Sequence, residues 1–289
     1  MTSPRRLREP RWRKMKTREA PAVEALLRSG ERCCMNACNR FINRKPLKGD
    51  AWVLHGDDGE LSAVLVHARQ ALLPVRRGGA RLPAPHFMRG IFGMAPLHSL
   101  QGRKSDVAIM EAEMEGMGLR AVEKVDFDLM CMDAPPGDPR AAGPAGLVTR
   151  EPSANDIDSL VELHAAYEKE EVMSGDRELN PAASRMRMEQ IFAREKMLVA
   201  DLGGRLVGKI NTNAATFTRY QIGGVYVRPD CRGMGIARRM AGAFVARLAA
   251  EGRGISLFVK KSNGAARQVY RNIGFEILDS YRINYYHKG

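Results

Sequence analysis

The chain has 289 residues, of which 44% are hydrophobic and 27% charged, so it is long enough for one or two domains with apolar cores. This composition excludes a collagen-like chain, a small disulfide-stabilised protein and a wholly disordered chain. No apolar run reaches the ~18–20 residues of a membrane span, and no apolar segment follows the basic start, so we expect neither a membrane span nor a secretory signal. Five cysteines, an odd number, fit free thiols in a reducing compartment, which predicts a cytoplasmic protein.

The formal net charge is +13, and it is unevenly distributed along the chain. Residues 1–16 hold seven basic residues and one acidic residue, 17–148 hold 17 and 16, and 149–289 hold 22 and 16. The excess therefore lies in a short N-terminal segment and in the C-terminal half. A basic surface attracts polyanions of any kind. We interpret residues 1–16 as a solvated flexible tail, with a nucleic-acid-binding arm as the alternative.

The segment 134–146, APPGDPRAAGPAG, is the clearest boundary, because its Pro and Gly residues sustain neither a helix nor a central strand. We interpret it as a linker between one domain over 17–133 and another over 147–289. In the first domain the pattern predicts helices over 21–28, 31–42 and 105–117, the last opened by Ser105, and strands over 51–55, 61–68 and 125–132. The segment 74–90, rich in Pro, Gly and Arg, has no predicted element.

The C-terminal domain has clearer patterns. Ser153 and Asp156 form a capping-box sequence that opens a helix, and strands on either side of Gly203-Gly204 form a hairpin. The predicted strands are 197–202, 205–215, 221–227, 255–259, 275–281 and 282–286, and the further helices are 181–194, 234–250 and 264–272. This order predicts an α/β fold with a mixed sheet and crossover helices.

The segment 225–239 contains the residues most informative about chemistry. A buried strand leads into a loop with Gly233 and Gly235, and a helix follows. Glycines let the backbone turn tightly, and the unpaired N–H groups and the dipole of the helix start form an anion site suited to a diphosphate. Alone, the loop also fits an ordinary strand–turn–helix connection, because Arg238 replaces the third glycine of the dinucleotide fingerprint and the P-loop ending is absent.

This stretch resembles the acetyl-CoA loop of the GNAT acetyltransferase superfamily, Arg/Gln-x-x-Gly-x-Gly/Ala, which reads here Arg232-x-x-Gly235-x-Ala237. Further along, Leu257-Phe258-Val259, Asn263, Ala266, Tyr270 and Gly274-Phe275 resemble the second CoA motif of the superfamily. The similarity covers roughly 150–289, and YEKEEV at 167–172 with a divergent first half resembles the two-domain members. The resemblance implies two GNAT-like domains in tandem, each a mixed β-sheet flanked by helices, the first without a cofactor site.

The resemblance also implies that acetyl-CoA is the acyl donor and shows where it would bind. Pantetheine would lie where the strand at Val225 and Val227 separates from the next strand and would bond to the main chain. The cofactor candidates are Val225, Tyr226, Val227, Arg232, Gly233, Met234, Gly235, Ile236, Ala237, Arg238, Asn263 and Arg267. The candidates for the 3′-phosphate are Arg238, Arg239, Lys260, Lys261 and Arg267.

Amine acetylation expels a thiolate, which a positioned acid can protonate. A tyrosine pKa of ~10 is close enough to a thiol pKa of ~8.5 for this transfer. In the family a tyrosine at the position of Tyr270 has this role, so we expect Tyr270 to be the general acid, with a core aromatic as the alternative. The strand 221–227 has no carboxylate, so Glu170 and Glu171 are the candidates for the base, beside a water relay.

These expectations describe an N-acetyltransferase that transfers an acetyl group to an amine. The acceptor stays open between a small amine, an antibiotic, a peptide N-terminus, a protein lysine and an RNA-linked amine. The alternatives are a non-catalytic acyl-CoA-binding regulatory module, a nucleic-acid-binding protein that uses the basic tail, and a transferase of longer acyl groups. We expect no metal, since Cys33, Cys34 and Cys38 have no fourth ligand and the histidines lack H-E-x-x-H spacing, and no membrane or nucleic-acid partner.

Overall fold

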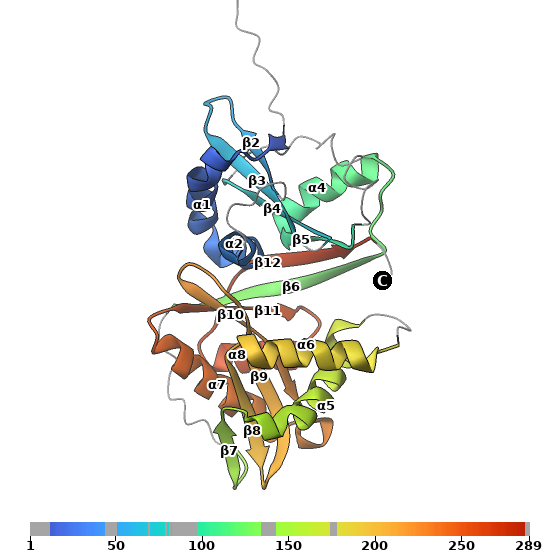
Figure 1. The fold of residues 1–289 in the computed structure, drawn as a ribbon, viewed down its shortest axis with the longest axis vertical. Coiled ribbons are helices and arrows are strands. Elements are labelled where there is room, and N and C mark those ends of the chain that lie inside the picture. Colours follow the sequence, from blue (N-terminus) through green and yellow to red (C-terminus); the bar gives the residue numbers. More distant parts are fainter. Residues whose placement is uncertain are drawn as a thin grey trace, which may run out of the picture. The chain divides into compact units, whose positions relative to one another are not determined.

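The computed structural model describes residues 12–43, 51–68, 70–78, 80, 82, 97–133, 143–173 and 178–286. The chain forms two compact units, the first made of Met1–Leu129 and Asp279–Gly289 and the second of Met130–Leu278. Each unit contains a mixed β-sheet flanked by helices, as the sequence predicts (Figure 1).

The sheet of the first unit has the strand order β1-β2-β3-β4-β5-β12-β6. Of the described pairs in this unit, β4 and β5 are parallel and the others are antiparallel. The strands are β1 (Arg13–Lys14), β2 (Ala51–His55), β3 (Leu61–Ala68), β4 (Ala71–Arg76), β5 (Ser99–Arg103), β6 (Glu123–Met132) and β12 (Glu276–Tyr285). The helices are α1 (Ala20–Ser29), α2 (Met35–Asn43) and α4 (Lys104–Gly116), and the short turns are η1 (Thr17–Glu19) and η2 (Glu31–Cys33).

Three features at helix ends and at the N-terminus differ from the sequence-based expectations. Residues 12–16 are not a solvated tail, because Arg13–Lys14 pairs with β2 and the side chains of Trp12 and Met15 are buried. Residues 1–11 of the expected tail lie outside the described residues. The helix expected over 31–42 is divided into η2 and α2, and α4 begins at Lys104, so Ser105 does not cap it.

The sequence pattern missed β4, which contains Pro74. A central strand pairs with a neighbour on each side, and proline has no N–H to donate to either of them. In the structure Pro74 pairs with Leu65 of β3, whereas the parallel pairing with β5 covers only Ala71 and Leu72. Pro74 is therefore tolerated, because the described pairing with β5 has ended before it.

The sheet of the second unit has the strand order β11-β10-β9-β8-β7, in which β10 and β11 are parallel and the others antiparallel. Its strands are β7 (Leu147–Arg150), β8 (Met197–Leu202), β9 (Arg205–Ala215), β10 (Arg219–Val227) and β11 (Gly254–Lys260). The predicted mixed sheet and the hairpin at Gly203-Gly204 are confirmed, while β7 was not predicted.

Helices cover both faces of this second sheet. They are α5 (Ile157–Tyr167), α6 (Pro181–Arg194), α7 (Ile236–Ala249) and α8 (Gly264–Asn272), with the short turns η3 (Ala154–Asp156), η4 (Glu168–Val172) and η5 (Pro229–Cys231). The predicted capping box before α5 is present, since Asp156 accepts a hydrogen bond from the Ser153 N–H at 2.6 Å. Tyr226 packs with the core under α5 and α6, and Val227 packs with the core under α7 and α8, as alternation along β10 requires.

The C-terminus also differs from the expectation. The two strands expected over 275–281 and 282–286 are the single strand β12. Its last residues pair with β5, from Tyr281↔Arg103 to Tyr285↔Ser99, and Asp279–Gly289 therefore belongs to the first unit. This differs from the expected division at the 134–146 linker, of which 134–142 lies outside the described residues.

Candidate functional site

The site begins where two parallel strands stop pairing. β10 and β11 pair from Arg219↔Gly254 to Ile222↔Leu257, and both strands continue beyond this pairing. β10 also has a bulge here, because Gly223↔Asn211 is followed by Tyr226↔Lys209. Gly224 and Val225 thus have a register partner on neither neighbouring strand. The Gly224 carbonyl accepts from Lys209 Nζ at 2.9 Å, so the Val225 peptide group is the part of the bulge that a ligand could bind.

The loop after β10 presents unpaired N–H groups. Gly233 and Gly235 have φ values of +78° and +79°, a left-handed conformation that favours glycine. The first bond of the helix runs from the Arg239 N–H to the Gly235 carbonyl at 3.1 Å. Along the described chain, no backbone acceptor is found for the N–H groups of 233–238. Together with the dipole of α7, these groups form an anion-binding turn.

The side chains of the predicted loop lie in different surroundings. Ile236 is 1% exposed and belongs to the core, and the Tyr226 side chain is buried under α5, so both offer a ligand their main chain alone. Met234 is exposed. Arg238 is half-buried, and its Nε has no hydrogen-bond partner within the described part of the chain.

Arg232 connects this loop to η4. Its Nη2 donates to Glu170 Oε2 at 2.7 Å, and its Nε donates to the Val227 carbonyl at 3.0 Å. The guanidinium carbon lies 5.5 Å from the centre of the Tyr226 ring. The hydrogen bond to Glu170 raises the pKa of Arg232, so the guanidinium stays charged.

Asn263 makes the corresponding contact at the next helix. Its Oδ1 accepts from the Ala266 N–H at 3.0 Å and caps α8, while its Nδ2 donates to Glu171 Oε1 at 3.0 Å. Lys260 Nζ lies 3.5 Å from the other oxygen of Glu171. The structure therefore brings both predicted glutamates to the predicted cofactor segments. Arg267 lies one turn into α8 and is half-buried.

Tyr270 is 7% exposed and packs edge-on against Phe275, with ring centres 5.9 Å apart. Burial raises the pKa of its hydroxyl, and the charges of Tyr167 and Glu171 raise it further. Tyr270 is thus protonated at neutral pH, and the raised pKa also makes it a weaker acid than an exposed tyrosine. Tyr167 and Glu171 therefore lie close enough to the Tyr270 hydroxyl to interact with it electrostatically.

Sequence reasoning missed a polar cluster behind the bulge. The side chain of Lys209 is 0% exposed, and its Nζ lies 4.9 Å from the centre of the Tyr167 ring. The His164 ring stacks on the Tyr167 ring, with ring centres 6.0 Å apart. Glu168 accepts from Arg187 Nη2 at 2.9 Å. Burial lowers the pKa of Lys209 to about 7. The sequence feature that could have indicated this cluster is the glycine pair at 223–224 inside a buried strand.

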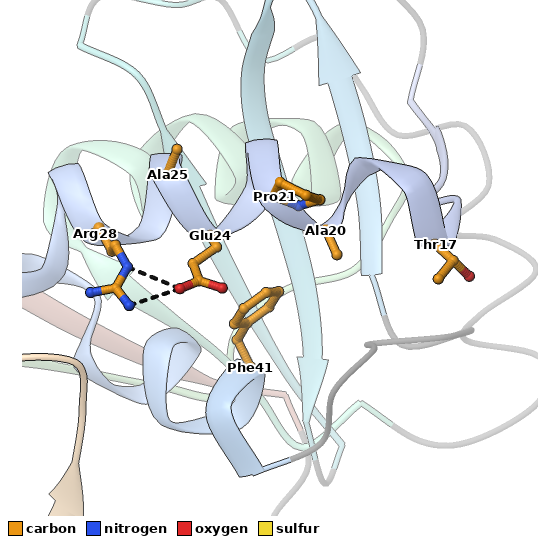
Figure 2. A pocket seen from close by; sticks show the side chains of 7 residues that line it. All are labelled: Thr17, Ala20, Pro21, Glu24, Ala25, Arg28 and Phe41. Atoms are coloured by element: carbon orange, nitrogen blue, oxygen red, sulfur yellow. Dashed lines mark hydrogen bonds and ion pairs between the residues drawn. The ribbon is translucent and has the colours of Figure 1, made fainter.

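The first unit has a separate groove of about 570 Å³ between α1 and α2 (Figure 2). Figure 2 shows the Phe41 ring beside the ion pair of Arg28 and Glu24, whose Nη2 and Oε1 atoms are 2.8 Å apart. The remaining lining residues are Thr17, Ala20, Pro21 and Ala25. None of the predicted site residues lines this groove.

Among the residues that the structure describes, no helix is long and apolar enough to cross a membrane. Within the same residues, no group of three or more His, Cys, Asp or Glu side chains is arranged to hold a metal ion.

Residues 158–275 match the sequence profile of the acetyltransferase (GNAT) family. The chain has the fold of a GCN5-related N-acetyltransferase from Sphaerobacter thermophilus, with a TM-score of 0.62, 21% identity and coverage of 100% of this chain and 98% of that one. A tandem GNAT protein from the clavulanic acid biosynthesis pathway gives a TM-score of 0.60 and 16% identity, covering 97% and 100%. A GCN5-related N-acetyltransferase from Kribbella flavida gives 0.53 and 15%, covering 94% and 96%. No curated protein sequence matches.

The second unit therefore contains a domain of the GNAT acetyltransferase family, and the chain as a whole has the tandem GNAT fold. The matched residues include the loop, η4 and α8. Because this family uses acyl-CoA as the acyl donor, the domain is an acyltransferase domain.

Proposed function

We propose that the second unit transfers an acetyl group from acetyl-CoA to an amine, with Tyr270 as the general acid. The observation that carries the proposal is the continuity of two features. The part of β10 that no longer pairs with β11 leads directly into the unpaired N–H groups of 233–238. An extended pantetheine arm followed by a diphosphate needs this order of main-chain groups.

In this proposal the N–H groups of 233–238 bind the diphosphate, and the main chain of Val225, Tyr226 and Val227 binds the amide groups of pantetheine. Asn263 orders the start of α8 beside them. Arg238 and Arg267 are the candidates for the 3′-phosphate. Arg232 holds the start of the loop to η4 through its ion pair with Glu170.

The chemical step needs three groups. Main-chain N–H groups at the bulge polarise the thioester carbonyl. The amine forms a C–N bond to the carbonyl carbon, the C–S bond breaks, and Tyr270 gives its proton to the departing sulfur. A base must take a proton from the amine. Glu171 is the first candidate, directly or through water, because its charge reaches the Tyr270 hydroxyl. Glu170, which holds Arg232, is the second.

The substitution Tyr270→Phe tests the acid. We expect kcat to fall by ~10²–10⁴-fold, the typical contribution of a general acid, while the affinity for coenzyme A is nearly unchanged. Free-thiol release from acetyl-CoA measures the first quantity and calorimetry the second. Tyr220→Phe is the matched control, because its hydroxyl binds Glu251 at 2.7 Å, away from the loop. Unchanged turnover in Tyr270→Phe would remove this residue from the mechanism.

A screen of donors and acceptors tests the reaction itself. Acetyl-CoA and longer acyl-CoA thioesters are each combined with small amines, peptides and protein lysines, and thiol release is followed. We expect release with acetyl-CoA and at least one amine. Binding of acetyl-CoA without release from any combination would indicate the non-catalytic regulatory module instead.

A further inference from the structure

The bulge of β10 consists of Gly224 and Val225 and directly follows Gly223. Gly224 has φ +58°, and together with Val225 it lies opposite a single residue of β9. A bulge redirects main-chain groups that would otherwise pair with the neighbouring strand. Its geometry therefore decides where the Val225 peptide group points.

Lys209 of β9 holds the carbonyl of this bulge. Its Nζ donates to the Gly224 oxygen at 2.9 Å and to Asn211 Oδ1 at 3.3 Å. The third neighbour is the ring face of Tyr167, 4.9 Å from Nζ to the ring centre. Two oxygens and a π face thus surround the amine, and one of the oxygens belongs to the bulge itself.

The glycines and the polar side chains of β9 fit one another. A Cβ at Gly224 would overlap with Asn211 Oδ1 and lie 3.0 Å from Lys209 Nζ, and a Cβ at Gly223 would overlap with the Asn213 amide. Asn211 donates in turn to Asn213 Oδ1 at 3.0 Å. The side chains of Lys209, Asn211 and Asn213 therefore lie directly on the β10 backbone, which explains a glycine pair in the middle of a buried strand.

A lysine in this position costs folding free energy. Its side chain is fully buried, and burial lowers its pKa to about 7 while the charge of Glu168 opposes the shift. A methionine would fill a similar volume without burying an amine. The lysine does one thing that methionine cannot do, which is to donate a hydrogen bond to the Gly224 carbonyl.

We propose that Lys209 is a positioning residue for acyl transfer: by holding the Gly224 carbonyl it fixes the bulge and aims the Val225 peptide group at the thioester. This inference rests on the proposed function of the second unit. It assigns Lys209 no contact with the substrate and no proton transfer.

The substitution Lys209→Met removes the donor and keeps the volume. We expect kcat to fall by about 10²-fold, the cost of a misplacement of about 1 Å, with KM for acetyl-CoA nearly unchanged. The variant should unfold at the same or a higher denaturant concentration, because a buried amine is gone. Lys196→Met is the control, since Lys196 is half-exposed and pairs with Glu251 at 2.8 Å. Unchanged kcat, or a loss of stability that accounts for the loss of activity, would overturn the inference.

A double variant tests whether Lys209 acts through the bulge. Gly224→Ala distorts the bulge directly on β10, whereas Lys209→Met acts on it from β9. If both act through the bulge, the double variant Gly224→Ala/Lys209→Met should lose little more activity than Gly224→Ala alone. Losses that multiply would show that Lys209 acts elsewhere, and would overturn the inference.

A second readout does not depend on turnover. With nitrogen-labelled valine, the Val225 amide signal should shift on addition of acetyl-CoA by the same amount in the wild type and in Lys196→Met, and by a different amount in Lys209→Met; identical shifts in all three proteins would overturn the inference. A wild type that neither binds coenzyme A nor releases thiol would overturn the proposed function and this inference together. An active wild type with an unaffected Lys209→Met overturns this inference alone.

Discussion

Lys209 and His164 are buried basic side chains, 0% and 4% exposed. Burial is the largest cause that lowers the pKa of each; the charge of Lys209 lowers that of His164 further, and Glu168 raises both. A pKa that is lower in the folded state means that the unfolded chain binds more protons between the two values. Stability therefore rises with pH across that window.

This linkage predicts how the stability of Lys209→Met compares with that of the wild type. The folded pKa of Lys209 is about 7, and an unfolded lysine titrates near ~10.4. The cost of the buried amine is present in full below the lower value and is relieved as the pH rises toward the upper one. The excess stability of the methionine variant should therefore shrink between these pH values, by at most ~1.4 kcal/mol per pH unit. Urea unfolding at several pH values measures it, and a pH-independent difference would contradict the burial of an ionisable amine.

At the scale of elements, hydrophobic periodicity located α6, β8 and β9 with the bounds that the structure shows. It failed where tertiary pairing overrides local preference. β4 tolerates Pro74 because its pairing with β5 is short, and β12 is continuous although the sequence pattern was interpreted as two strands. Such pairings depend on residues distant in sequence, which a local pattern does not contain.

The site shows the same limit. The glycine loop was predictable because its chemistry lies within one short segment. The contact between Lys209 and Tyr167 was not predictable, because β9 and α5 meet only in the folded unit. In addition, a lysine in a strand usually faces solvent. The contacts of Glu170 and Glu171 with Arg232 and Asn263 likewise required the structure.

The loop can be tested with two glycines in the same backbone conformation. Gly233 and Gly252 have φ values of +78° and +74°, and a Cβ at either would meet no atom within 4 Å. Alanine should therefore cost each position a similar ~1–2 kcal/mol of strain. Only Gly233→Ala rotates a peptide of the proposed diphosphate site, so it alone should weaken coenzyme A binding in calorimetry. Equal affinities of the two variants would argue against the loop assignment.

At the scale of the whole molecule, two strands have residues in both units, since β6 ends in the second unit and β12 begins in it. Met130–Met132 of β6 belongs to the second unit, where Cys131 Sγ lies 3.3 Å from Ser256 Oγ. The buried guanidinium of Arg219 forms an ion pair with Asp133 and donates to the Ile255 carbonyl at 2.8 Å. A Pro- and Gly-rich segment marks a loop in the sequence, but it does not show which residues before it pack with the domain that follows. The sequence therefore predicted two domains but not this division.

The most direct test of the central claim is a crystal structure of the full chain with coenzyme A. We predict that the diphosphate accepts hydrogen bonds from the N–H groups of 233–238 and that pantetheine lies along the part of β10 that no longer pairs with β11, within reach of Tyr270. Coenzyme A bound at another place, such as the groove between α1 and α2, would contradict the account.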